Sequence, residues 1–217
     1  MTKIYYSTLT NKIDRSIWSS LCAKTVSQKR ELVSRFQFDV DKKLSLYSNL
    51  LVRIIANKEL SVSNSQLTFC TNEYGKPHIA RYQDFNFNIS HTRSAIVIAI
   101  HTNEIGVDIE RVLKPELTIA RRFFTQQELC YIRETGNPER FYEIWTKKEA
   151  YIKWRGKGFA IPLLSFNVLE LSDLFYYRIL GDYALSVCGN LSSNIQLHRI
   201  TEQSLVDAAL ELEDIEV

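Results

Sequence analysis

The sequence has few of the features that mark specialised classes of protein. Its 4 cysteines include no close pair, which argues against a zinc module or a disulfide framework and fits reduced thiols in the cytoplasm. No apolar run approaches the roughly 20 residues that cross a bilayer, and the first residues lack the apolar core of a signal peptide, so we expect no membrane partner. The 27 Lys and Arg barely exceed the 25 Asp and Glu, which argues against nucleic acid as a partner.

Glycine and proline are also scarce, with 7 and 4 residues among 217. Neither a Gly-x-Gly-x-x-Gly fingerprint nor a Gly-x-x-x-x-Gly-Lys-Ser/Thr loop is present, so nucleotide-binding folds of the Rossmann and P-loop kinds are disfavoured. No Gly/Ser-rich or Pro-rich linker divides the chain. With 45% hydrophobic and 24% charged residues, the composition is that of a globular α/β or α+β protein.

Hydrophobic periodicity predicts an α+β protein with helices beside a few mostly antiparallel strands in each half. In the first half it predicts helices around 14–24, 28–36 and from Leu44, and strands over 3–9, 66–71, 85–90 and 95–101. In the second half it predicts a strand over 105–110, helices after Pro115 and from Asn137 to Gly156, and strands over 164–170, 174–180, 183–189 and 193–200. We expect the acidic tail from Ser204 to be partly disordered. The halves meet near residues 102–105, which favours two similar, closely packed lobes.

The segment Ile105–Glu110 (IGVDIE) carries two carboxylates on one face of its predicted strand. Because side chains alternate along a strand, Asp108 and Glu110 point one way while Val107 and Ile109 point into the core. Stacked carboxylates repel each other unless a cation lies between them, and Mg²⁺ prefers carboxylate oxygens. A solvated strand edge is the commoner explanation of an isolated Asp-x-Glu pair.

The long helix after Asn137 places charged residues beside its apolar stripe, which consists of Phe141, Ile144, Trp145 and Ile152. The same spacing puts Lys148 and Glu149 on or beside this stripe, with Lys153 one turn after Glu149. Charged groups on a face that should be buried must be paired or must bind something. The alternative is an i,i+4 pair of Glu149 and Lys153 on a solvated flank.

Ser90, His91 and the turn Gly75–Pro77 are the remaining candidates for ligand contacts. Adjacent strand residues face opposite ways, so Ser90 and His91 do not suit a nucleophile–base pair. Both could donate hydrogen bonds to a phosphate if the strand ends there, and a purely structural His91 stays open. The turn either cradles a ligand or only reverses the chain.

Taken together and in order, these pieces resemble the Sfp-type 4'-phosphopantetheinyl transferases. The matching stretches are YGKP from Tyr74, FNFNISH ending at His91, IGVDIE ending at Glu110, RRFFTQQE ending at Glu128, and WTKKEAYIKWRGKG from Trp145 to Gly158. One such motif would be weak, whereas five in register are specific. The resemblance implies two similar α/β lobes related by pseudo-twofold symmetry. Residues 1–103 would form the N-terminal lobe, on the adenine and 3'-phosphate side of coenzyme A, and residues 104–217 the C-terminal lobe with the metal and catalytic residues.

The resemblance also implies an activity, in which 4'-phosphopantetheine moves from coenzyme A to a serine hydroxyl of an apo acyl or peptidyl carrier protein and 3',5'-ADP is released. Asp108, Glu110 and Glu149 would hold Mg²⁺ against the pyrophosphate of coenzyme A. Lys153 would contact the pyrophosphate and stabilise the leaving group, with Lys148 nearby. Glu128 would be the base for the carrier serine.

Further contacts with coenzyme A are implied in the first lobe. His91 with Ser90 would contact a phosphate, and Gly75, Lys76 and Pro77 would line the adenine side. Relatives place basic residues against the 3'-phosphate, and Lys29 fits one of these positions. At two others this chain has Leu32 and Leu44, and either a shifted alignment or Lys43 as a substitute would account for this.

Two other functions fit the same residues. A Mg²⁺-dependent hydrolase of a nucleotide pyrophosphate would need no protein acceptor, and a binding module would hold coenzyme A or a carrier without turnover. The complete set of Asp108, Glu110, Glu149 and Lys153 favours the transferase. Because one chain would supply both walls of the cleft, we expect a monomer, and the sequence does not indicate which carrier it serves.

Overall fold

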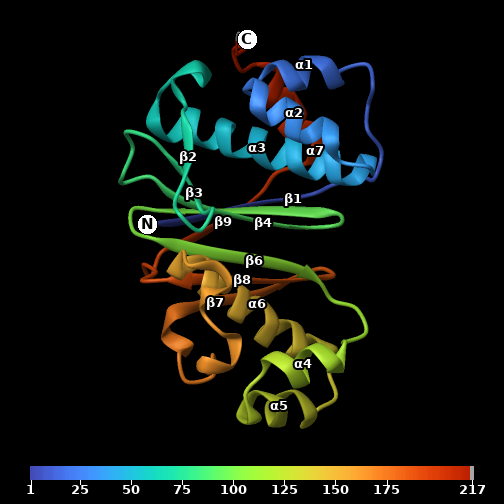
Figure 1. Ribbon diagram of the computed structural model, residues 1–217, viewed down its shortest axis with the longest axis vertical. Helices are drawn as coiled ribbons and strands as arrows, with labels where there is room; N and C mark the ends of the chain where they lie inside the picture. Colours follow the sequence, from blue (N-terminus) through green and yellow to red (C-terminus); the bar gives the residue numbers. More distant parts are fainter. Residues whose placement is uncertain (216–217) are drawn as a thin grey trace.

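The computed structural model describes residues 1–215 of the chain, without the side chain of Phe159. Two β-sheets face each other in the middle of the molecule, and each carries a layer of helices on its outer side (Figure 1). The upper sheet has the strand order β4-β5-β1-β9, with bounds Asn86–Thr92, Ala95–His101, Thr2–Thr8 and Ile195–Arg199. The lower sheet has the order β6-β8-β7, with bounds Ile105–Arg111, Tyr183–Gly189 and Phe175–Leu180.

The facing sides of the two sheets form one apolar layer. Ile4 and Val97 of the upper sheet pack with Val107, Ile109 and Val187 of the lower sheet, and all five are fully buried. The alternation expected for residues 105–110 is therefore confirmed, since Val107 and Ile109 point into this layer. Strand β5 is buried on both faces, because its alternate residues face the helices above.

The helices of the upper layer are α1 (Trp18–Ala23), α2 (Ser27–Arg35), α3 (Asp39–Leu60) and α7 (Glu202–Leu210). Their apolar faces meet on the upper sheet, where Leu46, Leu50 and Leu205 have no exposed surface. A small separate hairpin of β2 (Phe69–Thr71) and β3 (Pro77–Ile79) lies beside this layer. Short 3-10 turns cover Asn64–Gln66, Gly158–Ala160, Leu163–Ser165 and Ser172–Leu174.

The lower layer contains α4 (Leu117–Phe123), α5 (Gln126–Arg133) and α6 (Pro138–Arg155). Helix α6 begins as the sequence predicts, because the Asn137 side chain accepts a hydrogen bond from the Glu139 N–H and Pro138 occupies the first turn. It ends at Gly156, whose φ of 64° is the left-handed conformation that glycine adopts without strain.

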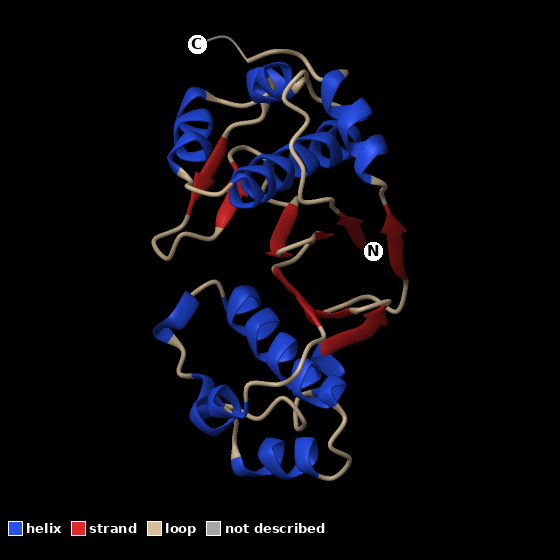
Figure 2. Cartoon of the chain, turned by 90° about the vertical axis from the view of Figure 1, so that its right-hand side faces the viewer, coloured by secondary structure: helices blue, strands red, loops and turns tan. Residues whose placement is uncertain are grey.

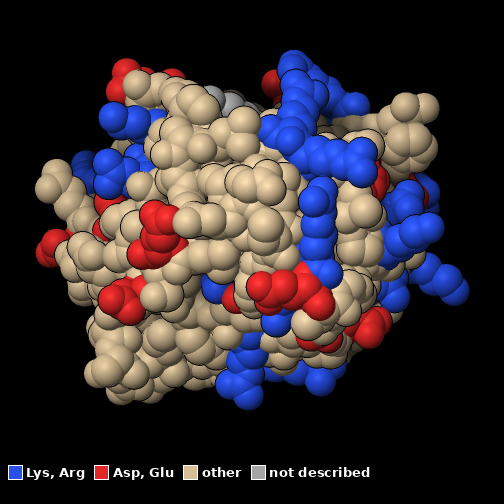
Figure 3. All heavy atoms as spheres, turned by 90° about the horizontal axis from the view of Figure 1, so that it is seen from below, with Lys and Arg blue, Asp and Glu red and all other residues tan. Residues whose placement is uncertain are grey.

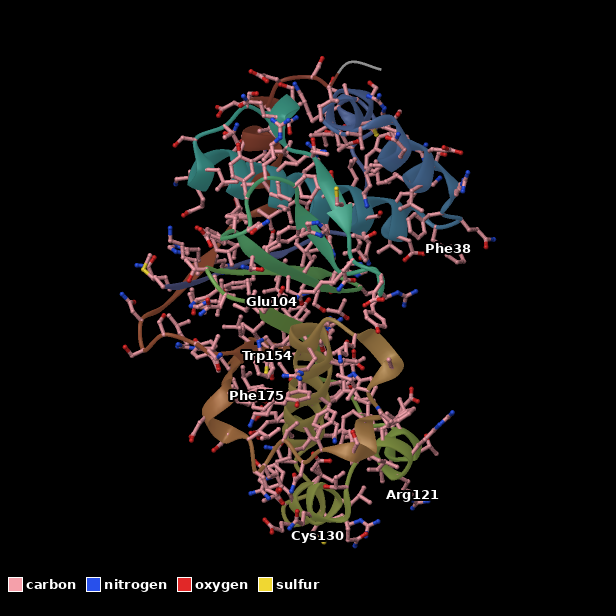
Figure 4. All side chains as sticks on the ribbon, turned by 60° about the vertical axis from the view of Figure 1, so that its left-hand side comes forward. Phe38, Glu104, Arg121, Cys130, Trp154 and Phe175 are labelled. Atoms are coloured by element: carbon pink, nitrogen blue, oxygen red, sulfur yellow. The ribbon has the colours of Figure 1, made fainter. Side chains whose placement is uncertain are left out.

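Helix α6 lies unusually close to β6 because Gly106 has no side chain. A Cβ atom at this position would lie 2.0 Å from the Ala150 carbonyl oxygen and 2.3 Å from the Trp154 nitrogen. The backbones of strand and helix therefore touch, and this contact sets where the side chains of α6 meet those of β6. Figure 4 shows Trp154 at the junction of the two lobes, near Glu104.

The end of the chain corrects the expected division into lobes. Strand β9 pairs in parallel with β1, from Thr2 opposite Ile195 to Tyr6 opposite Arg199, and α7 packs on α3. Residues 195–215 therefore lie with the first lobe, and a second lobe over 104–217 is wrong beyond residue 194. The expected disorder from Ser204 is also wrong up to residue 215, because Leu205, Val206 and Ala209 of α7 are buried in the upper core. Residues 216–217 of that tail lie outside the described residues.

Most other expected elements are found, and the α+β class is confirmed. The strand expected over 164–170 is wrong, since a 3-10 turn and irregular chain stand there. The pseudo-twofold relation of the lobes stays a prediction. In a view turned by 90° about the vertical axis, α3 lies above the sheets and α6 below them (Figure 2). Among residues 1–215, no helix is both long and apolar enough to cross a membrane.

Candidate active site

Three elements bring polar side chains together at the junction of the lobes. Asp108 on β6 is only 3% exposed, and its Oδ1 accepts hydrogen bonds from Ser90 Oγ of β4 at 2.7 Å and from Lys153 Nζ of α6 at 2.6 Å. Lys153 also donates to Ser90 Oγ at 2.9 Å, which closes a three-membered network. The sequence predicts each of these residues for the site, and the structure places them in direct contact.

The same network leaves one carboxylate oxygen without a partner. Asp108 Oδ2 is buried and has no hydrogen-bond partner among the described residues. A buried carboxylate oxygen that is left unpaired is costly, so its position points to a positively charged ligand.

Two more partly buried carboxyl groups, those of Glu110 and Glu149, interact electrostatically with Asp108. Burial and the negative charge of Asp108 raise the pKa of both Glu110 and Glu149 from 4.5 to about 7. The ammonium of Lys153 lowers both values only in part. One lysine does not neutralise three carboxyl groups, so the cluster favours the binding of a further cation.

The donor chemistry fits a hard divalent ion, because all the available atoms are carboxylate oxygens. Among residues 1–215, however, no three acidic, histidine or cysteine side chains already stand in a metal-binding arrangement. The structure thus shows a partly neutralised carboxylate cluster with an unpaired Asp108 oxygen, and a metal site there stays a prediction.

Two neighbouring cavities lie beside the first lobe, and one of them reaches the cluster at Lys153. The first, which we call the turn cavity, has a volume of about 230 Å³ and lies between Gly75, Lys76 and Pro77 on one side and Asn88 and Lys153 on the other. The predicted adenine-side turn therefore faces the predicted pyrophosphate contact. Gly75 has a φ of 87°, which a residue with a side chain adopts only with strain.

The second cavity, which we call the Lys29 cavity, has a volume of about 310 Å³ and is lined by Lys29 and His91 as its cationic groups. It shares Pro77 and Ile89 with the turn cavity, so the two cavities adjoin each other. No acidic residue in the described part of the chain lines it. Burial lowers the pKa of Lys29, and desolvation together with the ammonium of Lys153 lowers that of His91. An anion in this cavity would relieve both effects.

Comparison with known proteins decides the family. The model of the 4'-phosphopantetheinyl transferase superfamily matches residues 104–201, and that of the 4'-phosphopantetheinyl transferase N-terminal region matches residues 13–103. The chain is 30% identical to the 4'-phosphopantetheinyl transferase gsp of Aneurinibacillus migulanus, over 97% of this chain and 96% of that protein. The chain belongs to the 4'-phosphopantetheinyl transferase family. The resemblance drawn from its motifs is thereby confirmed, and with it the type of enzyme.

Two further relatives are also phosphopantetheinyl transferases by name. The chain is 34% identical to the 4'-phosphopantetheinyl transferase Sfp of Bacillus subtilis, over 74% of this chain and 80% of that protein. It is also 30% identical to the L-aminoadipate-semialdehyde dehydrogenase-phosphopantetheinyl transferase of Rattus norvegicus, over 67% of this chain and 53% of that protein. The match to the first relative spans both lobes.

Within this transferase, the expected roles of Glu128 and Lys148 do not fit their surroundings. Both side chains are fully buried and form an ion pair of 2.9 Å with each other. Glu128 Oε1 accepts from the Val168 N–H at 2.9 Å and Oε2 from the Thr125 N–H at 2.7 Å, so neither oxygen is left for a substrate. Lys148 Nζ also donates to the Leu163 carbonyl at 2.7 Å. The structure favours a role for this pair in joining α5 and α6 to the chain after α6.

Lys43 likewise cannot replace a basic residue of the 3'-phosphate site. Its ammonium is 1% exposed, donates to the carbonyl oxygens of Thr10 and Lys12 at 2.7 and 2.6 Å, and pairs with Glu202 of α7 at 2.5 Å. These partners use all three of its donors. The substitution expected from the sequence is therefore wrong, and Lys29 is the lysine that reaches the cavity.

Ser90 and His91 face opposite sides of β4, as alternation requires. Ser90 is buried against Asp108, whereas His91 is exposed beside the Lys29 cavity. The strand continues to Thr92, so the two residues do not converge on one phosphate as they would at a strand end.

Lys76 holds the lobes together as well as lining the turn cavity. Its ammonium pairs with Glu104 and donates to the carbonyl oxygens of Ile105 at 3.1 Å and Trp154 at 3.4 Å. Nearby, Asn72 Nδ2 donates to the Gly156 carbonyl at 2.9 Å. The turn is therefore fixed to the C-terminal end of α6, one turn beyond Lys153.

Sequence reasoning missed the polar residues of α3 that line the Lys29 cavity, namely Ser45, Ser48 and Asn49. Lys29 Nζ donates to Ser45 Oγ at 2.8 Å. The signal was present, because positions 45, 48, 49 and 52 follow helical spacing and form a stripe beside the apolar face.

Proposed function

We propose that the chain transfers 4'-phosphopantetheine from coenzyme A to a serine hydroxyl of an apo acyl or peptidyl carrier protein, releases 3',5'-ADP and requires Mg²⁺. The observation that carries this proposal is the network of Asp108, Ser90 and Lys153, with its unpaired Asp108 oxygen, beside the first of two adjoining cavities. Family membership supplies the reaction type.

Asp108, Glu110 and Glu149 are the residues that would hold the metal, with Asp108 Oδ2 as the first oxygen available to it. When bound, Mg²⁺ supplies positive charge that neutralises the pyrophosphate of coenzyme A. The raised pKa of Glu110 and Glu149 supports this assignment: burial and the charge of Asp108 raise it, and a cation among the carboxyl groups compensates both effects.

Lys153 stabilises the phosphate of the leaving group. Its ammonium already lies at the point where the turn cavity meets Asp108, and Ser90 Oγ holds it there at 2.9 Å. An ammonium fixed in place before the reaction stabilises developing negative charge without reorganisation. The two adjoining cavities bind the rest of coenzyme A, with Lys29 and His91 as the cationic contacts to a phosphate.

Glu149 is the group that takes the proton of the carrier serine. Glu128, the base expected from the sequence, has both oxygens engaged in a buried network. Glu149 lies one turn before Lys153 on α6, and burial together with the charge of Asp108 raises its pKa, so its carboxyl group stands within the cluster where the serine must lose its proton. Glu149 would thus serve both as a ligand of the metal and as the acceptor of the serine proton.

The carrier is expected to approach over the second lobe. Leu113 and Leu117 are 58% and 54% exposed and follow β6 directly, a few residues after Glu110. Viewed from below, basic side chains gather toward one side of this lobe, with acidic groups among and beside them (Figure 3). Exposed leucines with Lys114 between them in the chain suit a carrier domain with an acidic surface.

The test is the rate of transfer to an apo carrier by Glu149→Gln and by Glu143→Gln. Both replace a carboxylate by an amide on α6, but Glu143 pairs with Lys147 and the Tyr131 hydroxyl instead of with the cluster. We expect a loss of at least a hundredfold in the first variant and less than threefold in the second. Full activity of Glu149→Gln would contradict the assignment, and consumption of coenzyme A without a carrier would favour the hydrolase.

A further inference from the structure

Arg53 of α3 is a buried cation without a counter-charge. Its side chain is 1% exposed, and in residues 1–215 no carboxylate forms an ion pair with it. Its partners are neutral, since NH1 donates to the side-chain and main-chain oxygens of Asn64 at 2.9 and 3.3 Å and Nε to Asn49 Oδ1 at 3.0 Å. A buried charge is costly to keep unless it is compensated, so this arrangement needs an explanation.

The guanidinium contacts two residues that line the Lys29 cavity. Asn49 accepts its Nε–H, and the Phe69 ring lies 4.9 Å from its central carbon. Arg53 itself is not part of the lining. It thus lies directly behind the wall of the cavity and holds two of the groups that form its surface.

The bond to Arg53 decides what Asn49 presents to the cavity. Because the amide oxygen faces Nε, the amide NH₂ is the end left for a ligand, and it can only donate. Ser48, which is 5% exposed, also lines the cavity, and its Oγ has no hydrogen-bond partner among the described residues. Together with Lys29 and His91, these groups give the cavity donors and positive charge but no carboxylate.

We propose that Arg53 is a positioning residue for coenzyme A: it fixes the Asn49 amide as a donor and adds positive charge behind the Lys29 cavity, so that Asn49 and Ser48 bind a phosphate group of the co-substrate with Lys29. The inference rests on the proposed function, which places coenzyme A in these cavities. It assigns roles to three residues of α3, and the compensating charge for Arg53 is the bound phosphate itself.

If Arg53 had only a structural role, its loss would change the stability of the upper lobe without a specific effect on phosphate binding. Arg53 also bonds to Asn64, whose Nδ2 donates to the carbonyl oxygens of Lys24 and Glu213, so its loss could simply loosen the upper lobe. The variant that separates the two roles is Asn49→Asp. It keeps an acceptor for Arg53, and the resulting ion pair leaves the fold at least as stable, but it replaces the donor in the cavity by a negative charge.

The experiment measures binding of 3',5'-ADP and of 5'-AMP, which lacks one phosphate, by calorimetry, together with the melting temperature. We expect Asn49→Asp to weaken 3',5'-ADP at least tenfold and 5'-AMP less, with no fall in melting temperature. Arg53→Met should weaken 3',5'-ADP in the same sense, and Arg53→Lys should recover part of the loss. Asn190→Asp adds the same charge in an exposed loop outside the cavity and should bind as the wild type does.

Wild-type affinity for 3',5'-ADP in folded Asn49→Asp, or an equal loss of both nucleotides, would overturn the inference while the transferase assignment stood. If the wild type itself bound neither coenzyme A nor 3',5'-ADP, the proposed function would fail and this inference with it. The wild-type titration therefore comes first and separates the two results.

Discussion

At the scale of single residues, Asp108 is the residue that joins the others of the candidate site. One of its oxygens is used twice, by Ser90 and Lys153, and the other is buried without a partner. A cation bound at Asp108 Oδ2 would give this buried oxygen the partner that it lacks among the described residues. Burial and the charge of the same carboxylate raise the pKa of Glu110 and Glu149 to about 7.

The first test removes the hydroxyl that joins β4 to this network. Ser90→Ala takes one hydrogen bond from Asp108 Oδ1 and one from Lys153 Nζ, so we expect a loss of about 1–3 kcal/mol in the free energy of unfolding. Transfer should fall about tenfold or more, because Lys153 is no longer held in place. Chemical denaturation and the transfer rate measure the two effects. Ser94→Ala, which removes a contact to the Tyr183 hydroxyl away from the cluster, should spare the rate.

A second test at this scale uses pH. The pKa of Glu110 and Glu149 rises from 4.5 in the unfolded chain to about 7, so between these values the folded protein binds more protons than the unfolded one. Stability without metal should therefore fall as the pH rises from about 4.5 to about 7. Melting curves with and without Mg²⁺ should show a larger metal-dependent rise at pH 8 than at pH 5.5. An equal rise at both would contradict the carboxylate site.

At the scale of elements, the active site depends on how closely α6 lies against β6. Gly106→Ala would place a methyl group 2.0 Å from the Ala150 carbonyl oxygen, and neither backbone can yield without moving the helix. We expect a loss of about 3 kcal/mol in stability. Transfer should be nearly abolished, because Glu149 and Lys153 move with the helix.

Denaturation and transfer assays of Gly106→Ala and Gly181→Ala check this expectation. Gly181 lies in the turn between β7 and β8 with a φ of 59° and open space around it, so alanine there costs only the backbone strain of about 1–2 kcal/mol. An active Gly106→Ala protein would show that the close approach is not needed for the site.

The elements near the site were predictable because their signals are local. Alternation along residues 105–110 and the cap at Asn137 are read within a few residues, and the structure confirms both. The pairing of Lys148 with Glu128 and of Lys43 with Glu202 was not predictable, since the partners lie 20 and 159 residues apart in the chain. Spacing placed Lys148 on the buried side of α6, but could not show what it meets there.

At the scale of the whole molecule, the chain closes on itself. Strand β9 and helix α7 return from the second lobe to the first, where β9 pairs with β1 and α7 packs on α3, the helix that lines the Lys29 cavity. No local sequence pattern predicts that β9 pairs with β1, because a parallel pairing between the two ends of a chain depends on the fold as a whole. The same return explains why the sequence assigned residues 195–215 to the second lobe.

Leu205→Ala tests this closure. Leu205 has no exposed surface and belongs to the upper core, so its truncation should cost about 2–5 kcal/mol. Because α7 supports α3, the affinity for coenzyme A should fall as well. Gln203→Ala changes an exposed residue of the same helix and should do neither. Denaturation and calorimetry measure both, and a variant as stable as the wild type would contradict the packing role of α7.

The central claim is that the carboxylate cluster and the two cavities move phosphopantetheine from coenzyme A to a carrier serine. The most direct measurement is the intact mass of an apo carrier domain after incubation with the purified protein, coenzyme A and Mg²⁺. We expect a gain of one phosphopantetheinyl group on the serine, equal release of 3',5'-ADP, and loss of both when the metal is chelated. An unchanged carrier mass across acyl and peptidyl carriers, with coenzyme A still bound, would contradict it.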